Sequence, residues 1–148
     1  AYNYPDRARP LTEAGRDQAA RLGVTLAREI GAFSVAVSSD AQRARETFAA
    51  ILARVDTDDS WHDRSIYDGG EEEVIELART FTGEAGLIVG HEPVISYAGY
   101  ILAHQEDRGA ADRGVPTATA LVLSFEGAWE DLAPGTCAVR VFYTPPTR

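Results

Sequence analysis

The stretch that decides the fold is Gly86-Leu87-Ile88-Val89-Gly90, followed at once by His91-Glu92-Pro93. A short apolar run without polar interruption is typical of a strand that is covered on both faces, as in a parallel sheet. Pro93 is suited to the first turn of a helix, and Gly90 lets the backbone approach a ligand closely. His91 therefore lies at a strand-to-helix junction, where a protonated imidazole can donate to a phosphoryl oxygen. The alternative is a histidine that only caps the helix or fills the core.

A second strand-to-helix junction occurs earlier in the chain. Residues 33–37 form a short β-rich run, and Ser39 with Gln42 forms a capping box that predicts the start of a helix. Arg43 then lies about one turn inside the helix, where free N–H groups and the helix dipole favour an anion. Its planar guanidinium matches phosphate oxygens. The alternative is that Arg43 lies on a solvated helical face and pairs with an acidic neighbour such as Asp40.

The remaining pattern predicts strands that alternate with helices. Thr12 is the expected N-cap of a first helix that ends near Gly31, and three consecutive glutamates from Glu71 suit the first turn of another. Alternating apolar residues at 119–125 and a second run at 137–143 predict two strands near or at a sheet edge. This order favours an α/β layered domain with a mainly parallel sheet.

Length and composition restrict the class of protein. The chain has 148 residues, enough for one domain with its own core. Lys+Arg 14 against Asp+Glu 23 gives a net charge of −9, so we expect neither a nucleic-acid partner nor an anionic membrane partner. The single cysteine, Cys137, rules out an intrachain disulfide and a zinc site with four cysteines. No apolar run approaches the ~18 residues of a membrane span, and we expect a cytoplasmic protein.

Three further residues are weaker candidates when each is taken alone. Arg9 lies in the loop ahead of the first helix, where it either faces the same site or is simply exposed. His62 and His104 have no comparable setting, and we interpret His62 as part of a loop and His104 as the end of a helix. None of the three indicates a site by itself.

Taken together, three segments resemble the histidine phosphatase superfamily, in the same order and at similar spacing. They are Arg9-Pro10-Leu11-Thr12, the segment from Ser39 to Thr47 that contains Arg43, and Val89-Gly90-His91-Glu92-Pro93. The C-terminal part, with Pro116-Thr117-Ala118 and Leu123-Ser124-Phe125-Glu126-Gly127, is similar to the tail of the SixA-type phosphohistidine phosphatases. The resemblance covers nearly the whole chain. It implies a three-layer α/β/α sandwich with a mostly parallel central sheet, as in phosphoglycerate mutase.

The resemblance implies transfer of a phosphoryl group to a histidine of the protein, followed by hydrolysis of the phosphoenzyme. By this resemblance, Arg43 is expected to bind the equatorial oxygens of the phosphoryl group. His91 is expected to be a second histidine that stabilises charge on the transferred group. The backbone N–H of Glu92 and the side chain of Arg9 are further expected phosphate contacts. Asp68 is the expected proton donor, although Asp-Gly-Gly at this place also indicates a simple turn. We expect no metal and no cofactor, because arginine and imidazolium supply the positive charge.

One motif of that family does not occur in the sequence. The family's nucleophile belongs to an Arg-His-Gly motif at the end of the first strand, just before the loop that matches residues 1–10. Neither His62 nor His104 has an equivalent place. We therefore expect residues 1–148 to be a single histidine phosphatase domain that lacks its N-terminal strand and Arg-His-Gly motif, both of which precede Ala1.

The expected function is hydrolysis of phosphohistidine in a protein, or of a small phosphorylated substrate, through a phosphohistidine intermediate on the enzyme. A broad phosphomonoesterase of the same fold is a second enzyme hypothesis, because few residues lie in insertions that could build a deep, specific pocket. A phosphate-binding pseudoenzyme or interaction domain is the alternative from a different class. That alternative requires a protein without any Arg-His-Gly motif.

Overall fold

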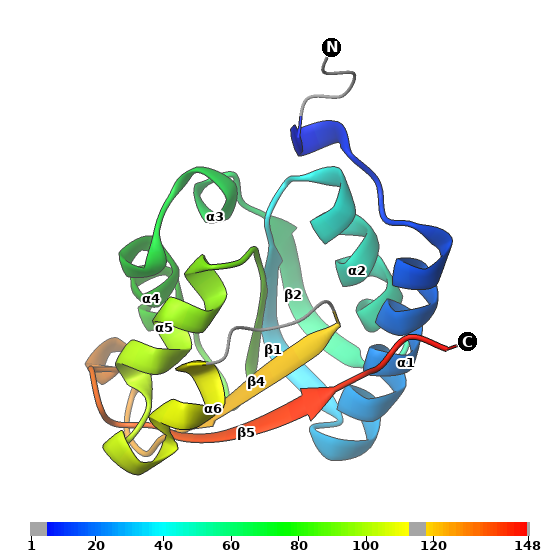
Figure 1. Cartoon of the computed structure of the whole chain (residues 1–148). Helices are drawn as coiled ribbons and strands as arrows, with labels where there is room; N and C mark the ends of the chain where they lie inside the picture. Colours follow the sequence, from blue (N-terminus) through cyan, green and yellow to red (C-terminus); the bar gives the residue numbers. More distant parts are fainter. Residues whose placement is uncertain (1–5, 113–117, 148) are drawn as a thin grey trace.

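The computed structural model describes residues 6–112 and 118–147, in which strands and helices alternate along most of the chain (Figure 1). The strands are β1 (Ala32–Ser38), β2 (Asp56–His62), β3 (Gly86–Val89), β4 (Thr119–Ser124) and β5 (Ala138–Tyr143). The α-helices are α1 (Glu13–Glu29), α2 (Gln42–Leu52), α3 (Ser65–Asp68), α4 (Glu71–Arg79), α5 (Val94–Leu102) and α6 (Arg108–Asp112). Short 3₁₀ helices lie at Asp6–Ala8, Gln105–Asp107 and Trp129–Asp131. Residues 1–5 of the expected first loop, and Pro116 and Thr117 of the C-terminal motif, lie outside the described residues.

Two helices begin where the sequence predicts. Thr12 is the N-cap of α1, and its hydroxyl accepts a hydrogen bond from the Gly15 N–H at 3.0 Å. Leu22 and Leu26 then bury one face of this helix. α4 begins at Glu71 with three glutamates in its first turn, where the helix dipole favours negative charge. Both helix predictions are confirmed.

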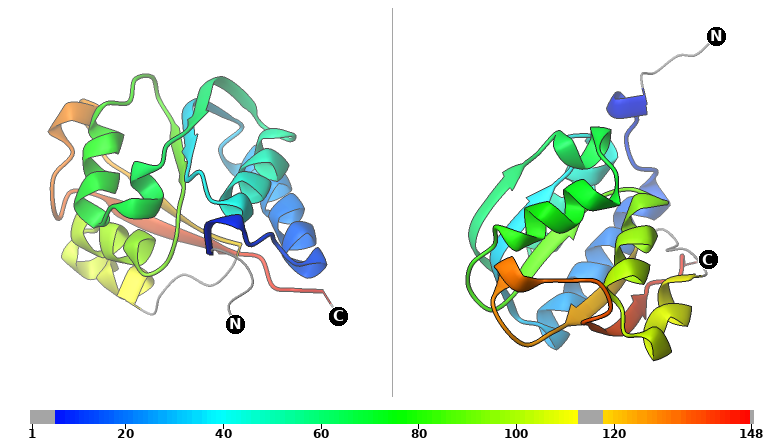
Figure 2. Two further views of the ribbon diagram at one scale, coloured as in Figure 1. Left: turned by 90° about the horizontal axis from the view of Figure 1, so that it is seen from above. Right: turned by 90° about the vertical axis from the view of Figure 1, so that its left-hand side faces the viewer.

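The strands form a central layer between two layers of helices. β1 is the middle strand of a parallel sheet in the order β2-β1-β3, and β4 pairs with β5 in an antiparallel sheet. α1 and α2 lie on one side of the strands, with α4 and α5 on the other (Figure 1, Figure 2). The core beneath α1 and α2 includes Leu87 of β3 and Ala120 of β4, and the opposite core includes Ile88 of β3 and Leu123 of β4. Both sheets therefore contribute to both cores, and the expected three-layer α/β/α sandwich is confirmed.

An apolar cavity of about 790 Å³ lies between β3 and β4. It is lined by Gly86–Val89 and Thr119–Ser124 together with helix residues from both outer layers, and we call it the β3–β4 slot. Within the described residues, β3 pairs only with β1 and β4 only with β5, so each has one edge without a strand partner. All four residues of β3 are only partly buried. The side chains of β3 still pack into both cores, with Leu87 beneath α1 and α2 and Ile88 on the opposite side, so the predicted cover on both faces is confirmed. The partial burial comes from the cavity at the open edge of the strand.

Two local predictions near the first junction are wrong. His62 is the last residue of β2 rather than part of a loop, and it pairs with Ser38 of β1. The expected capping box does not form, because α2 begins at Gln42 with Ala41 as an N-cap that makes no side-chain bond. The Ser39 hydroxyl instead accepts a hydrogen bond from the Ala41 N–H at 3.1 Å. Ser39 thus orders the loop before α2 without capping the helix.

Candidate functional site

The carboxyl ends of β1 and β3 lie next to each other. The two strands are parallel neighbours, and Ser38 is paired with Val89 at their ends. The Ser39 N–H donates to the Val89 carbonyl oxygen at 2.9 Å. The loops that follow both strands therefore begin side by side, at the edge where open α/β sheets bind their ligands.

Arg43 and His91 lie just beyond the ends of β1 and β3 and contact each other. Arg43 is the second residue of α2, and its Nη2 lies 3.4 Å from Nδ1 of His91. The Arg43 side chain is 23% exposed, and both residues line the β3–β4 slot. A helix N-terminus, a guanidinium and an imidazole thus face one position. This arrangement is suited to an oxyanion.

Ser39 orients the ring of His91. The Oγ of this fully buried serine lies 2.7 Å from His91 Nε2. Because a guanidinium only donates, the contact with Arg43 requires Nδ1 to accept, and the ring proton lies on Nε2 and is donated to Ser39. Burial, and then the Arg43 guanidinium, lower the pKa of His91 from its ordinary 6.5, against an opposing effect of Asp6 and Asp40. His91 is therefore neutral at pH 7, with Nδ1 turned towards Arg43.

A carboxylate occupies the position in front of Arg43. Asp6 Oδ2 accepts hydrogen bonds from Arg43 Nη2 at 3.1 Å and from the Tyr67 hydroxyl at 2.7 Å. Arg43 Nη1 also donates to the main-chain oxygen of Asp6 at 3.0 Å, and Arg9 donates to Asp6 Oδ1 at 3.1 Å. The Tyr67 hydroxyl first, and the Arg43 guanidinium next, lower the pKa of Asp6. Neither Asp6 nor Tyr67 is marked by any local sequence pattern.

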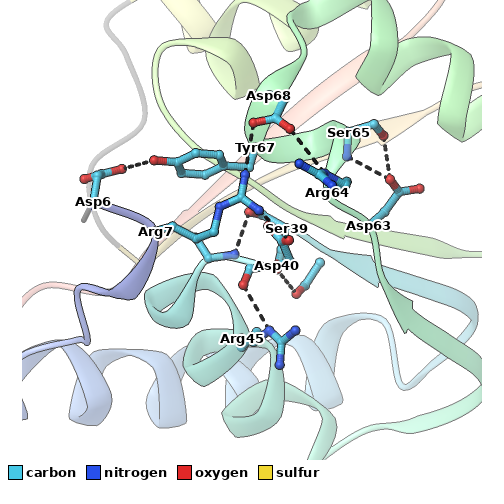
Figure 3. Close-up of polar contacts among 12 residues, drawn as sticks. Asp6, Arg7, Ser39, Asp40, Arg45, Asp63, Arg64, Ser65, Tyr67 and Asp68 are labelled. Atoms are coloured by element: carbon cyan, nitrogen blue, oxygen red, sulfur yellow. Dashed lines mark hydrogen bonds and ion pairs between the residues drawn. The ribbon is translucent and has the colours of Figure 1, made fainter. Parts of the chain in front are cut away.

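Arg7 ties the N-terminal turn to the ends of β1 and α3. Its Nη1 donates to Asp40 Oδ2 at 2.8 Å, and its Nη2 donates to Asp68 Oδ1 at 3.0 Å (Figure 3). The guanidinium also lies over the ring of Tyr67, 4.5 Å from the centroid. Ion pairs at a surface contribute little to stability individually. We therefore interpret this network as one that positions side chains around the site.

Asp68 lies apart from the Arg43–His91 pair. It is the last residue of α3, its side chain is half exposed, and it does not line the β3–β4 slot. Its carboxylate is directed at Arg7 and at Arg64, with Arg64 Nε 3.5 Å away (Figure 3). Among the described residues, Asp68 is therefore linked to the Arg43 site through Arg7 and its neighbours and not by a direct contact.

Glu92 and Arg9, by contrast, line the same slot as Arg43 and His91. The Glu92 carboxylate accepts hydrogen bonds from the Ser96 N–H at 2.9 Å and the Ser96 hydroxyl at 2.7 Å, at the start of α5. This bond fixes the turn in which His91 and the backbone of Glu92 lie. Arg9 is exposed and reaches the site through its ion pair with Asp6.

The two other histidines lie outside this cluster. His62 Nδ1 is 3.0 Å from Ser38 Oγ, and the ring packs edge-on against Phe48. His104, close to the end of α5, has its Nδ1 3.1 Å from the carbonyl oxygen of Gly135. Neither histidine lines the β3–β4 slot.

Neither a membrane-spanning helix nor an assembled metal site occurs in residues 6–112 and 118–147. The longest helix of this part, α1, has 17 residues and is interrupted by charged side chains. No three or more His, Cys, Asp or Glu side chains in these ranges form a group that could hold a metal ion. The positive charge found at the site comes from arginine side chains.

Acidification from about pH 7.5 to about 5.5 is expected to lower the Tm, in part through His91. Because folding lowers the pKa of His91, the unfolded chain binds a proton below 6.5 that the folded protein does not bind. The stability that this histidine contributes is therefore present above pH 6.5 and is lost as the pH falls through the folded pKa. Thermal melts should show a smaller pH dependence in His91→Gln than in the wild type. Equal slopes would contradict the assigned environment of His91.

Comparisons with known proteins identify the family. A profile described as Histidine phosphatase superfamily (branch 1) matches residues 6–68. Two Mycobacterium tuberculosis proteins, Uncharacterized protein MT1313 of strain CDC 1551 / Oshkosh and Uncharacterized protein Rv1276c of strain H37Rv, are each 31% identical over 153 residues, which cover 96% of this chain and 95% of theirs. The chain belongs to the histidine phosphatase superfamily.

Solved structures that are similar to this member of the histidine phosphatase superfamily include SixA proteins. A Nakamurella multipartitia protein assigned as phosphohistidine phosphatase SixA has a TM-score of 0.82 and 29% identity, over 97% of this chain and 90% of that one. The corresponding Agrobacterium tumefaciens protein has a TM-score of 0.74 and 25% identity, over 84% and 82%. Phosphoglycerate mutase from Plasmodium falciparum shares the fold, with a TM-score of 0.61 at 20% identity over 93% and 87%. The expected SixA-type, phosphoglycerate mutase-like fold is confirmed, and the family supports a phosphatase, hence a hydrolase.

Proposed function

We propose that the protein is a phosphatase that hydrolyses phosphohistidine in a protein, or a small phosphorylated substrate, through a phosphohistidine intermediate. The observation that carries the proposal is that Arg43 contacts His91 and also holds a carboxylate, that of Asp6. A phosphoryl group presents oxygens of the same kind with more negative charge. The SixA neighbours assigned as phosphohistidine phosphatases support this class of substrate.

In the proposed reaction, Arg43 and His91 stabilise the phosphoryl group while it moves. The two N–H groups that Arg43 directs at two oxygens of Asp6 would hold two equatorial oxygens. His91 keeps its Nε2–H on Ser39 and, once protonated, donates from Nδ1 to the same group. Arg9 and the backbone N–H of Glu92 are proposed as further contacts. These groups supply positive charge, so the reaction is proposed to need no metal ion.

The proposed chemistry has two displacement steps. A histidine nitrogen attacks phosphorus, the bond from phosphorus to the leaving group breaks, and the leaving group takes a proton. Water then attacks the phosphohistidine, which releases inorganic phosphate and returns the free imidazole. Asp68 is the proposed proton donor of the first step, and it must leave its ion pairs with Arg7 and Arg64 to act. An imidazole leaving group needs less help from an acid than an alkoxide does.

The nucleophile is proposed to be a histidine on an additional strand that fills the β3–β4 slot and lies outside residues 1–148. Such a strand would pair with the open edges of β3 and β4 and cover their half-buried apolar residues. If it runs parallel to β3, it ends beside Arg43 and His91, which line the same slot. Residues 1–148 and this strand then form one histidine phosphatase domain.

Trapping the intermediate tests the function and the nucleophile together. The full-length protein is mixed in EDTA with a phosphohistidine peptide or p-nitrophenyl phosphate, quenched in alkali, digested, and mapped by mass spectrometry. We expect phosphohistidine on a residue outside 1–148, with His62 and His104 unmodified. Phosphate on His62 or His104 would overturn the strand proposal. Phosphate binding without turnover of either substrate would identify a phosphate-binding pseudoenzyme.

A further inference from the structure

We infer that Tyr67 is a further ligand of the phosphoryl group, and that its hydroxyl donates to the same oxygen as Arg43, at the position held by Asp6 in this structure. The inference rests on the proposed function and deepens it, because it adds a neutral donor to the phosphate site. Tyr67 lies on α3, next to Asp68, and carries no signal of its own in the sequence.

Two donors from different elements meet on a single oxygen. Asp6 Oδ2 lies 2.7 Å from the Tyr67 hydroxyl and 3.1 Å from Arg43 Nη2. The same Arg43 nitrogen lies 3.4 Å from His91 Nδ1. Hydrogen bonds to a charged oxygen are short and strong when they are geometrically good. A phosphoryl oxygen at this position would meet the donors of Tyr67 and Arg43, with His91 at their side.

The ring of Tyr67 is held by its neighbours, so its hydroxyl has a fixed direction. The ring is perpendicular to that of His91, with centroids 5.3 Å apart, and the Arg7 guanidinium lies over its face. Arg7 is in turn held by Asp40 and Asp68 (Figure 3). A donor that is positioned before the ligand arrives loses little freedom on binding and therefore contributes more to affinity.

Asp6 competes with a phosphoryl group for these donors. Its carboxylate carries one negative charge and is 51% exposed, whereas a phosphoryl group brings three oxygens and more charge. A phosphoryl group must displace this carboxylate before it can bind Arg43 and Tyr67. In the wild type, removing the Tyr67 hydroxyl therefore has two opposing effects on the affinity for phosphate. Phosphate loses a hydrogen bond, which weakens its binding. The Asp6 carboxylate also loses a hydrogen bond, which makes it easier to displace. Removing Asp6 separates the two effects.

The test measures the affinity for inorganic phosphate by calorimetry in the full-length wild type, Asp6→Ala, Tyr67→Phe and the double variant. We expect Asp6→Ala to bind phosphate more tightly than the wild type. In the Asp6→Ala background, Tyr67→Phe is expected to weaken binding about tenfold, the loss typical of one hydrogen bond to a charged group. Tyr97→Phe, at an exposed tyrosine of α5, is the matched control and should leave the affinity unchanged.

The outcomes separate this inference from the proposed function. Equal affinities of Asp6→Ala and the double variant would overturn it, because Tyr67 would then only hold Asp6. Tyr67→Phe alone would in that case bind phosphate more tightly than the wild type. Absence of phosphate binding in both the wild type and Asp6→Ala would instead overturn the phosphate site and the proposed function with it. Phenylalanine keeps the ring that packs on His91 and Arg7, and thermal melts check that each variant folds.

Discussion

Arg43→Ala is expected to lower kcat/KM by about 10³-fold or more, because the arginine supplies both charge and two directed donors to the transferred group. Its position as the second residue of α2 adds the field of the helix N-terminus. Nη1 and Nη2 already donate to two different oxygens of Asp6, at 3.0 and 3.1 Å, which shows that the planar group faces the site with both nitrogens. The measurement is hydrolysis of p-nitrophenyl phosphate by the full-length protein in EDTA.

Two companion variants make the Arg43 result specific. Arg43→Lys keeps the charge but loses the two-pronged geometry, so most of the loss should persist. Arg45 lies on the same helix, is exposed and donates to the Asp40 carbonyl oxygen at 3.0 Å, so Arg45→Ala should hydrolyse substrate close to the wild-type rate. Turnover close to wild type in Arg43→Ala, or an equal loss in Arg45→Ala, would show that the site has been assigned to the wrong arginine.

The elements that could be predicted from the sequence have local signals. α1 begins at Thr12 and follows an apolar stripe at helical spacing, and β3 is an apolar run between two glycines. β2 could not be predicted, because Asp56–His62 contains three aspartates and leaves all but one residue exposed. It becomes a strand because its backbone pairs along the length of β1. That pairing depends on the tertiary fold, which overrides the weak strand propensity of the residues themselves.

The same distinction applies to the site. The meeting of Arg43 and His91 could be predicted because they lie in the segments that follow β1 and β3 along the chain. Asp6 and Tyr67 could not, because their roles arise from contacts between residues 37 and 61 positions apart. Ser39 was expected to cap α2, whereas its hydroxyl meets His91, 52 positions away. A serine after a strand has many possible partners, and only the packing of β1 against β3 selects this one.

The proposed further strand rests on two independent features. The first comes from a family motif that residues 1–148 do not contain, and the second from the open edges of β3 and β4. Leu87 and Leu121 lie in the middle layer of the molecule, yet both are only partly buried. An apolar strand in the slot would bury such side chains at a gain of roughly 25 cal/mol per Å² of apolar surface, besides satisfying backbone groups. The slot therefore supports the proposed location of the nucleophile.

His91→Ala is expected to lower kcat/KM on the order of 10²–10³-fold while the protein still folds, the loss typical of one preorganised donor to developing negative charge. In this structure, Nε2 is engaged by Ser39 and only Nδ1 faces Arg43, so the donation to phosphate must come from Nδ1. His91→Asn retains an amide that can donate near the place of Nδ1, and it should recover part of the rate. His104→Ala, beyond the other end of α5, should match the wild type.

The pH profile separates charge stabilisation by His91 from a role in packing. Because burial and the Arg43 guanidinium lower the pKa of His91, the protonated form is lost as the pH rises through a value below 6.5. The kcat/KM of the wild type should therefore fall as the pH rises over that range, and His91→Asn should lack this change because an amide does not titrate. An unchanged profile in His91→Asn, or a rate close to wild type in His91→Ala, would mean that His91 only fills the space beside Ser39.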